Sequence, residues 1–114
     1  MTMAAWVGAA VTVALGIFGA IAPRAAARMV GLAPTDPGNF AEVRATYGGL
    51  FLAMGGACLV FRTSEAYAIT AAAWLGAAVL RCVSLAVDRR ATRRDIAGVA
   101  LEAVVGLLLA WGAF

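Results

Sequence analysis

The sequence predicts an all-α membrane protein: four transmembrane helices in an antiparallel bundle, with a short interfacial helix between the first and second. Composition is the first reason, because 64% of the 114 residues are hydrophobic and only 13% are charged, whereas soluble domains hold about 45–50% apolar and about 25% charged residues. The mean hydropathy of +0.93 agrees. The second reason is that the apolar residues form runs long enough to cross a ~30 Å hydrocarbon core as helices. We expect residues 1–114 to form one domain with spans at 4–22, 40–61, 66–87 and 96–114.

The first span ends in a stretch that looks like a signal-peptide cleavage site. The start of the chain carries no positive side chain, however, and Pro23 would follow the cut directly. We therefore expect this segment to be retained as a transmembrane helix. Pro23 suits the first turn of a helix, and Arg24 and Arg28 fall on one face before Gly31 ends it. This pattern predicts a short basic helix on the membrane surface.

The second and third spans carry signals for where each helix begins. Asn39, with Glu42 three residues later, has the spacing of a capping box, so the second helix is expected to begin near Phe40. Ser64 is the expected N-cap of the third helix. Small residues recur at helical spacing along the second span and predict the face that packs against a neighbour. They are Thr46, Gly49, Ala53 and Gly56.

The arginines predict an orientation. The first and third loops, with their flanking residues, hold seven arginines, whereas the second loop holds only Arg62. Because short cytoplasmic loops are rich in Arg and Lys, we expect loops 23–39 and 88–95 to be cytoplasmic and both termini to be outside. The seven arginines are Arg24, Arg28, Arg44, Arg89, Arg90, Arg93 and Arg94.

A buried ion pair is predicted between the third and fourth spans. Arg81 is the only charged residue between Glu65 and Asp88, and a guanidinium inside a membrane helix needs a partner or water. Arg81 lies six residues before the cytoplasmic end of its span, and Glu102 six residues after the matching end of the next, so each is about 9 Å deep. Pairing keeps both side chains charged at the least cost. Whether the pair is structural or functional stays open.

Further polar residues are expected at the depth of this pair. The first two turns of the second span bring an acid, an arginine and a tyrosine, and the third span adds a serine and an aspartate near its end. Each has a simpler alternative role, as a helix cap, a positive anchor, an interfacial aromatic residue or a solvated helix end. The predicted ligand-binding or structural polar cluster is Glu42, Arg44, Tyr47, Arg81, Ser84, Asp88 and Glu102.

Nothing in the sequence points to a metal, a cofactor or a catalytic residue, and we expect none. No histidine is present, and Cys58 and Cys82 have no metal-ligand spacing. Neighbouring spans would place the two cysteines near opposite membrane faces, too far apart for a disulfide. Both are expected to be small apolar core residues. No nucleophile–base pair and no phosphate-binding loop is visible.

The start of the second span has a recognisable pattern. An E-x-R-x-x-Y-G-G motif begins at Glu42, and Arg81, Asp88 and Glu102 follow in the later spans. Together they resemble a family of small bacterial four-helix integral membrane proteins catalogued as a domain of unknown function. The resemblance covers nearly the whole chain and implies one shared polar site in a bacterial cytoplasmic (inner) membrane, with no activity attached. The family often has Gly after the residue that matches Asp88, where this chain has Arg89.

The sequence favours a binding protein. The preferred interpretation is an accessory or small-ligand- or lipid-binding membrane protein whose polar cluster holds an anionic, quinone-like or lipid head group. The alternative is a small oligomeric transporter or channel that uses Glu102 and Arg81 for ion or proton coupling. An enzyme is least favoured, since a Tyr–Arg–Glu site offers only proton transfer. Expected partners are the lipid bilayer and, as open alternatives, a larger membrane complex or a homo-oligomer. The net charge of +3 lies in short loops and does not indicate nucleic-acid binding.

Overall fold

The structure, a computed structural model, describes residues 2–30 and 37–113. All regular elements in these two ranges are helices. Four helices of this described part are long and apolar enough to cross a membrane. The predicted helical class with four long apolar helices is therefore confirmed. These helices are α1 (Met3–Ile21), the stretch Phe40–Phe61, α5 (Ser64–Asp88) and α6 (Arg93–Ala113).

The second long helix is built from successive elements. α3 (Pro37–Val43), the π-helix η1 (Arg44–Leu50) and α4 (Phe51–Phe61) follow one another without a break. A short helix, α2 (Pro23–Met29), follows α1 directly and begins at the predicted proline. The predicted end of this helix at Gly31 lies outside the described residues.

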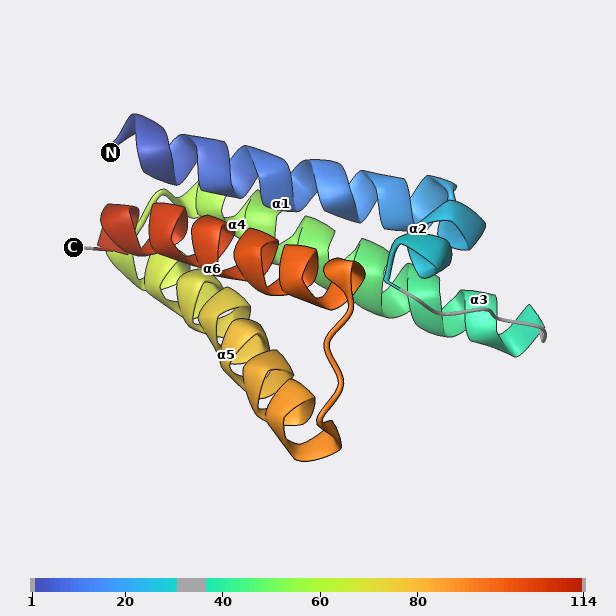
Figure 1. The fold of residues 1–114 in the computed structure, drawn as a ribbon. Helices are drawn as coiled ribbons and strands as arrows, with labels where there is room; N and C mark the ends of the chain where they lie inside the picture. The colour runs from blue at the N-terminus through green and yellow to red at the C-terminus, as the bar shows by residue number, and fades with distance from the viewer. Residues whose placement is uncertain (1, 31–36, 114) are drawn as a thin grey trace.

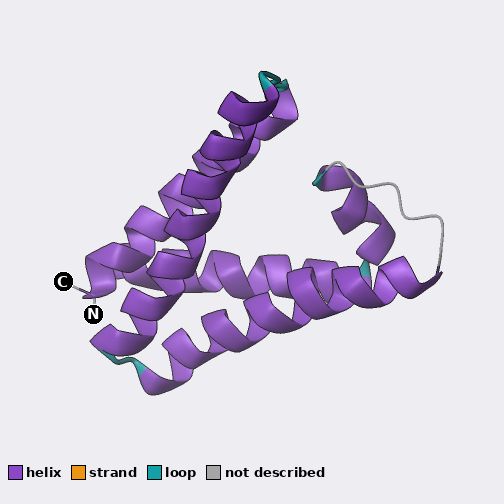
Figure 2. Ribbon diagram, turned by 90° about the horizontal axis from the view of Figure 1, so that it is seen from below, coloured by secondary structure: helices purple, strands orange, loops and turns teal. Residues whose placement is uncertain are grey.

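The helices form two arms (Figure 1). α1 packs along η1 and α4, and α5 packs on α6, while a contact between α1 and α6 joins the arms. Seen from below, the arms meet at the end that holds both termini and the turn between α4 and α5 (Figure 2). They spread apart toward the other end, where α2 lies in the opening. This spread leaves room between the arms for the site described below.

Glycines let α1 and η1 pack backbone against backbone. A Cβ built on Gly16 would lie 2.6 Å from the Leu52 backbone nitrogen, and one on Gly48 would lie 3.0 Å from a backbone nitrogen of α1. A side chain on Gly19 would collide with the Tyr47 carbonyl group. Any larger residue would push the two helices apart, so close approach of this arm depends on these glycines.

The predicted packing face of the second long helix is wrong. The face that contacts α1 holds Gly48 and Gly55, whereas a Cβ on Gly56 would meet nothing within 4 Å. Both sets of small residues have helical spacing, so spacing alone cannot choose between them. The glycines of α1 make the choice, because their shape fits the Gly48 side. The predicted residues that the structure leaves exposed are Thr46, Gly49 and Ala53.

The π-helix η1 interrupts what the sequence predicts as an ordinary α-helix. π-Helical hydrogen bonds join residue i to residue i+5, and such segments are rare and frequent at functional sites. Gly48 and Gly49 lie inside η1, and glycine has a low preference for the α-helix. The paired glycines are therefore the one sequence signal for this departure. The segment carries Tyr47 toward the space between the arms.

A buried hydrogen bond joins α5 to the middle of α1. The Trp74 indole nitrogen donates to Thr12 Oγ1 at 3.1 Å, and the Thr12 hydroxyl donates to the Gly8 carbonyl at 2.8 Å. Both side chains are buried, where water does not compete for the bond. Trp74 also packs on Phe51, with ring centroids 5.0 Å apart. This contact sets where α5 crosses the other arm.

The two cysteines have different surroundings. Cys58 is buried and donates its thiol to Thr70 Oγ1 at 3.3 Å, whereas Cys82 is exposed on α5. The expectation that both are core residues is therefore wrong for Cys82. Successive helix residues point in directions about 100° apart, from 3.6 residues per turn. The turn that directs Arg81 toward α6 therefore directs Cys82 outward.

Two helices begin at residues other than the predicted ones. The N-cap of α5 is Thr63, whose hydroxyl accepts from the Ala66 backbone N–H at 3.2 Å, and Ser64 is the first helical residue. Asn39 lies inside α3, which begins at Pro37, so Asn39 is not an N-cap. Proline and threonine both suit helix starts. In each case an earlier residue begins the helix first.

Two arginines end helices in the left-handed backbone conformation. Arg62 closes α4 with φ 54° and Arg89 closes α5 with φ 51°. Glycine adopts this conformation most readily, so a glycine would fit the position of Arg89 without strain. Arg62 is held by further contacts: Nε donates to the Leu59 carbonyl at 3.2 Å, and the guanidinium lies 5.4 Å from the Trp6 ring centroid.

Candidate functional site

The centre of the candidate site is an ion pair between α5 and α6. Arg81 Nε donates to Glu102 Oε1 at 2.7 Å, and Arg81 Nη2 donates to Oε2 at 3.2 Å. Two parallel bonds are the strong form of an arginine–carboxylate contact. The Glu102 side chain is 11% exposed and that of Arg81 is 33% exposed. The predicted contact between these two residues is confirmed.

Gly98 makes room for the guanidinium on α6. A Cβ built on Gly98 would lie 3.1 Å from Arg81 Cζ and 3.2 Å from Arg81 Nε, closer than nearly all real Cβ contacts. The guanidinium therefore lies directly over the Gly98 backbone. Gly98 and Glu102 are four residues apart and share one face of α6. The Arg81 guanidinium therefore packs on the backbone of α6 at Gly98, next to the Glu102 carboxylate.

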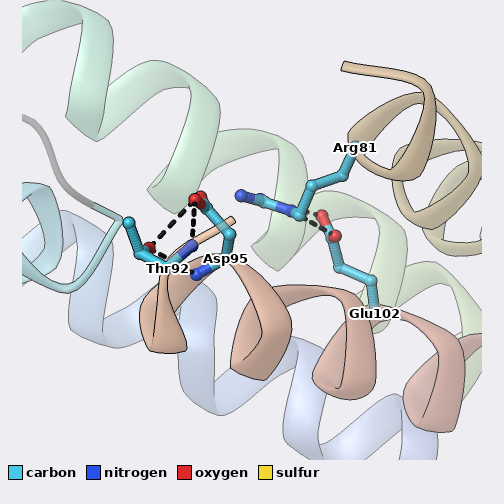
Figure 3. A network of polar contacts seen from close by, with 4 residues as sticks. All are labelled: Arg81, Thr92, Asp95 and Glu102. Atoms are coloured by element: carbon cyan, nitrogen blue, oxygen red, sulfur yellow. Dashed lines mark hydrogen bonds and ion pairs between the residues drawn. The ribbon is translucent and has the colours of Figure 1, made fainter. Parts of the chain in front are cut away.

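A second carboxylate, that of Asp95, lies on the other side of the Arg81 guanidinium (Figure 3). Asp95 forms a capping box with Thr92 at the start of α6: Asp95 N donates to Thr92 Oγ1 and Thr92 N donates to Asp95 Oδ2, each at 3.2 Å. The Thr92 hydroxyl also donates to Asp95 Oδ2 at 2.9 Å. Figure 3 shows the Arg81 guanidinium extending from Glu102 toward the Asp95 carboxylate. Arg81 is therefore bonded to one carboxylate and points toward another.

A cavity of about 210 Å³ lies beside the ion pair, between the two arms. Side chains of α1, α2, η1, α4, α5 and α6 line it. Phe51 stands among its aromatic walls, 6.0 Å from the Tyr47 ring in an edge-to-face contact and 5.0 Å from the Trp74 ring. The lining is mostly apolar, and its aromatic residues are Phe18, Tyr47, Phe51 and Trp74.

Polar side chains from both arms line the cavity. α5 and α6 contribute Arg81 and Glu102, which bind each other. α6 also contributes Arg94, and η1 contributes Tyr47. Within the described ranges, neither the Tyr47 hydroxyl nor the Arg94 guanidinium has a hydrogen bond or an ion pair. The cavity therefore offers two hydrogen-bond donors that the protein itself does not use.

The structure brings together three of the predicted cluster residues and leaves four apart. Tyr47, Arg81 and Glu102 line the cavity. The others are exposed and are not among its lining residues: Ser84 donates to the Asp88 carboxylate at 3.4 Å near the end of α5. Glu42 and Arg44 lie on the exposed side of the second long helix. The polar residues at this end of the chain thus divide between the cavity and the outer surface.

Sequence reasoning missed Arg94, Gly98 and Asp95 as parts of the site. Their signal is a spacing: Asp95, Gly98 and Glu102 recur at i, i+3 and i+7, which places them on one face of a helix. Arg94 had been counted only as a loop charge for orientation. The aromatic lining has no such signal, because it depends on the angle between the two arms.

The arrangement offers a bound molecule hydrogen bonds and aromatic contact. Within residues 2–30 and 37–113, no three His, Cys, Asp or Glu side chains lie close enough to hold a metal ion. The polar groups at the cavity offer hydrogen-bond donors and one neutralised carboxylate, and the walls offer aromatic surface. A small molecule with an apolar ring and a polar group matches both.

Comparisons with known proteins found no match: no protein-family model, no curated protein and no solved structure is similar to this chain. The resemblance carried by the E-x-R-x-x-Y-G-G motif therefore stays an expectation. What the structure itself defines is a class, a helical protein with four candidate membrane-spanning helices and a mostly apolar cavity that carries an ion pair in its wall.

Removing one member of the ion pair is predicted to cost more than removing both. Glu102→Gln leaves a guanidinium without its carboxylate, and because Arg81 is partly exposed we expect a loss near the lower end of ~3–5 kcal/mol. Arg81→Met costs less, since a lone Glu102 can take up a proton. The double variant should recover most of the loss. Thermal unfolding in mild detergent measures all three, and strictly additive losses would show that the side chains do not interact.

Replacing Gly98 by alanine is predicted to bring no stability gain. Alanine for glycine inside a helix usually stabilises by roughly 0.5–1 kcal/mol, but here the methyl group meets a guanidinium that two bonds hold. Gly76→Ala is the matched control, because nothing lies within 4 Å of its Cβ position. The gain at Gly98 should return in the Arg81→Met/Glu102→Gln background. Equal gains at both glycines in the native background would mean that Arg81 moves aside freely.

Proposed function

We propose that this protein is an integral protein of the bacterial cytoplasmic (inner) membrane that binds a small amphipathic ligand in the cavity between its arms. The observation that carries the proposal is the cavity itself, with aromatic walls and with one unused hydrogen-bond donor from each arm. Ligand sites in proteins have this composition: mostly apolar lining with a few converging polar groups. Such a role makes the protein an accessory or carrier of its ligand.

The proposal includes a transmembrane antiparallel bundle. Supporting it are the four long apolar helices and the large apolar side chains that these helices expose. On α5 they include Val79, Leu80 and Val83, and on α6 Leu107. An exposed apolar surface of this kind is unstable in water and suits lipid contact.

We propose that the end with α2 and the α5–α6 loop faces the cytoplasm and that α2 lies at the membrane surface. The support is that the loop arginines gather at this end, which follows the positive-inside pattern. α2 has the two sides that an interfacial helix needs: Ala26 and Ala27 are buried, while Arg28 is exposed. Arg24 lies over the Phe40 ring at 5.2 Å and ties α2 to the second long helix.

The size of the cavity limits the ligand. A dry apolar cavity of about 150 Å³ is large enough for benzene, and this one measures about 210 Å³. It therefore suits one ring with small substituents, or the ring end of a longer amphiphile whose tail leaves between the arms. A whole lipid does not fit inside it.

Binding is favoured over ion or proton coupling by the state of Glu102. Both of its carboxylate oxygens accept hydrogen bonds from Arg81, so a transported cation or proton would have to break that pair. A carboxylate that binds the transported ion or proton must be able to release its ion-pair partner during the transport cycle. The geometry therefore supports a fixed wall of a binding site.

The proposed orientation predicts where a fused reporter is active. Alkaline phosphatase joined after Phe114 should be active in bacterial cells, because the enzyme folds only outside the cytoplasm, and a fluorescent protein there should stay dark. The same two reporters placed in the Arg89–Thr92 loop should give the reverse result. A bright reporter after Phe114 would overturn the orientation without removing the four spans.

The binding function predicts that filling the cavity prevents ligand retention. Ala97 lines the cavity and Ala100, on the same helix, does not, so Ala97→Trp and Ala100→Trp form a matched pair. Protein purified in mild detergent should carry a small molecule that native mass spectrometry detects. We expect Ala97→Trp to lose it and Ala100→Trp to keep it. Absence of any bound molecule from the native chain, together with no binding of added ring compounds, would contradict the function.

A further inference from the structure

We propose that the cavity selects ligands that carry one negative charge on a ring-sized apolar body, and that Arg94 binds this charge. The inference rests on the ligand-binding function proposed above and adds the class of ligand. It is argued from the charges that line the cavity, from the position of Arg94 and from the donor on the facing wall.

Among the described residues that line the cavity, one positive charge has no partner. The charged residues of this lining are Arg81, Arg94 and Glu102, and Asp95 lies outside it, on the far side of the Arg81 guanidinium (Figure 3). Arg81 and Glu102 neutralise each other through two hydrogen bonds, while Arg94 has no ion pair in the described part of the chain. Arg94 is exposed, so its attraction for an anion at this largely apolar wall is modest. An anion is therefore the complement of this wall.

Arg94 lies on the cavity side of α6. It is in the first turn of the helix, and Ala97 and Leu101, three and seven residues later, also line the cavity. Residues at these spacings share one helix face. Arg93, the neighbouring residue, is not among the lining residues. Of the two adjacent arginines, Arg94 thus lines the cavity in which we propose that the ligand binds, and Arg93 does not.

Tyr47 supplies a donor from the other arm. Its ring is half-buried and stands edge-on to Phe51, and its hydroxyl has no hydrogen bond within the described residues. Arg94 belongs to α6 and Tyr47 to η1, so the two donors come from opposite sides of the opening. A carboxylate has two oxygens and can accept from both. The aromatic walls then face the ring that carries it.

A cationic ligand is disfavoured by the same geometry. The one acidic residue among the described lining residues is Glu102, and both of its oxygens already accept hydrogen bonds from Arg81. Binding a cation there would leave the Arg81 guanidinium unpaired over Gly98, and removing one partner of a buried pair is strongly unfavourable. A neutral ring compound meets no such obstacle but gains nothing from Arg94.

The test compares three ring compounds of equal size on the full chain in nanodiscs of zwitterionic lipid. The probes are 4-butylbenzoate, 4-butylbenzamide and 4-butylbenzylammonium, and isothermal calorimetry measures each affinity. We expect the benzoate to bind about tenfold tighter than the amide, the effect of one modest charge contact, and the ammonium compound to bind weakest. Arg94→Gln should remove the difference between acid and amide, while Arg93→Gln, the matched control, should keep it.

Each outcome decides one of the two proposals. If none of the compounds binds, the binding function fails. If acid and amide bind equally, or the ammonium compound binds best, the function stands and the charge selection is overturned. Equal losses in Arg93→Gln and Arg94→Gln would also overturn it, because they would indicate a general attraction by the basic end. Tyr47→Phe is a second variant and should weaken the benzoate several-fold.

A further experiment distinguishes a free acid from an anionic lipid as the natural source of the charge. The titration is repeated in nanodiscs of phosphatidylglycerol. If lipid head groups enter the site, they compete, and the neutral amide also binds at least tenfold more weakly than in zwitterionic discs, an effect that repulsion of the benzoate by the charged surface does not produce. If the site takes a free acid, Arg94 still discriminates acid from amide in both membranes. Loss of that discrimination in zwitterionic discs would overturn the inference.

Discussion

The ion pair between Arg81 and Glu102 is the contact that the rest of this structure depends on. A guanidinium inside an apolar helix must be met by a negative charge, and the nearest one is on the next helix along the chain. Meeting it requires that α6 present a carboxylate and, one turn earlier, no side chain at all. Gly98 provides the second condition. The relation of α5 to α6 is therefore set by electrostatics as well as by apolar packing.

The other arm is held by different means. α1 and η1 approach through glycines, with backbone atoms of one helix against backbone atoms of the other. Close backbone packing leaves no space between these helices. In the arm formed by α5 and α6, Gly106 of α6 lets Leu75 of α5 approach closely as well, and the Arg81–Glu102 pair adds a polar contact beside the cavity. The cavity lies where the two arms diverge. Its aromatic wall belongs mainly to the first arm, and its charged wall belongs to the second.

Counting residues along the apolar runs predicts the Arg81–Glu102 ion pair but not the cavity. The depth of Arg81 and Glu102 follows from counting residues to the ends of two apolar runs, because helical rise per residue is constant. The angle between arms follows from contacts between distant segments, such as Trp74 with Thr12, which no local pattern encodes. The same limit explains why helical spacing predicts the stripe that holds Thr46 and Gly56, whereas α1 packs against the one that holds Gly48 and Gly55. Two faces of one helix satisfied the same spacing, and only the shape of α1 distinguishes them.

The contact of Arg81 with Gly98 also links which residues evolution allows at positions 81, 98 and 102. As long as the guanidinium lies over α6, a side chain at position 98 would have to displace Arg81 by a few tenths of an ångström, whatever its helix preference. A lineage that replaced the ion pair by apolar residues would release that position at the same time. We therefore expect Arg81, Gly98 and Glu102 to change together in sequences that descend from this one. An alanine at position 98 would indicate a chain in which the ion pair had already been replaced.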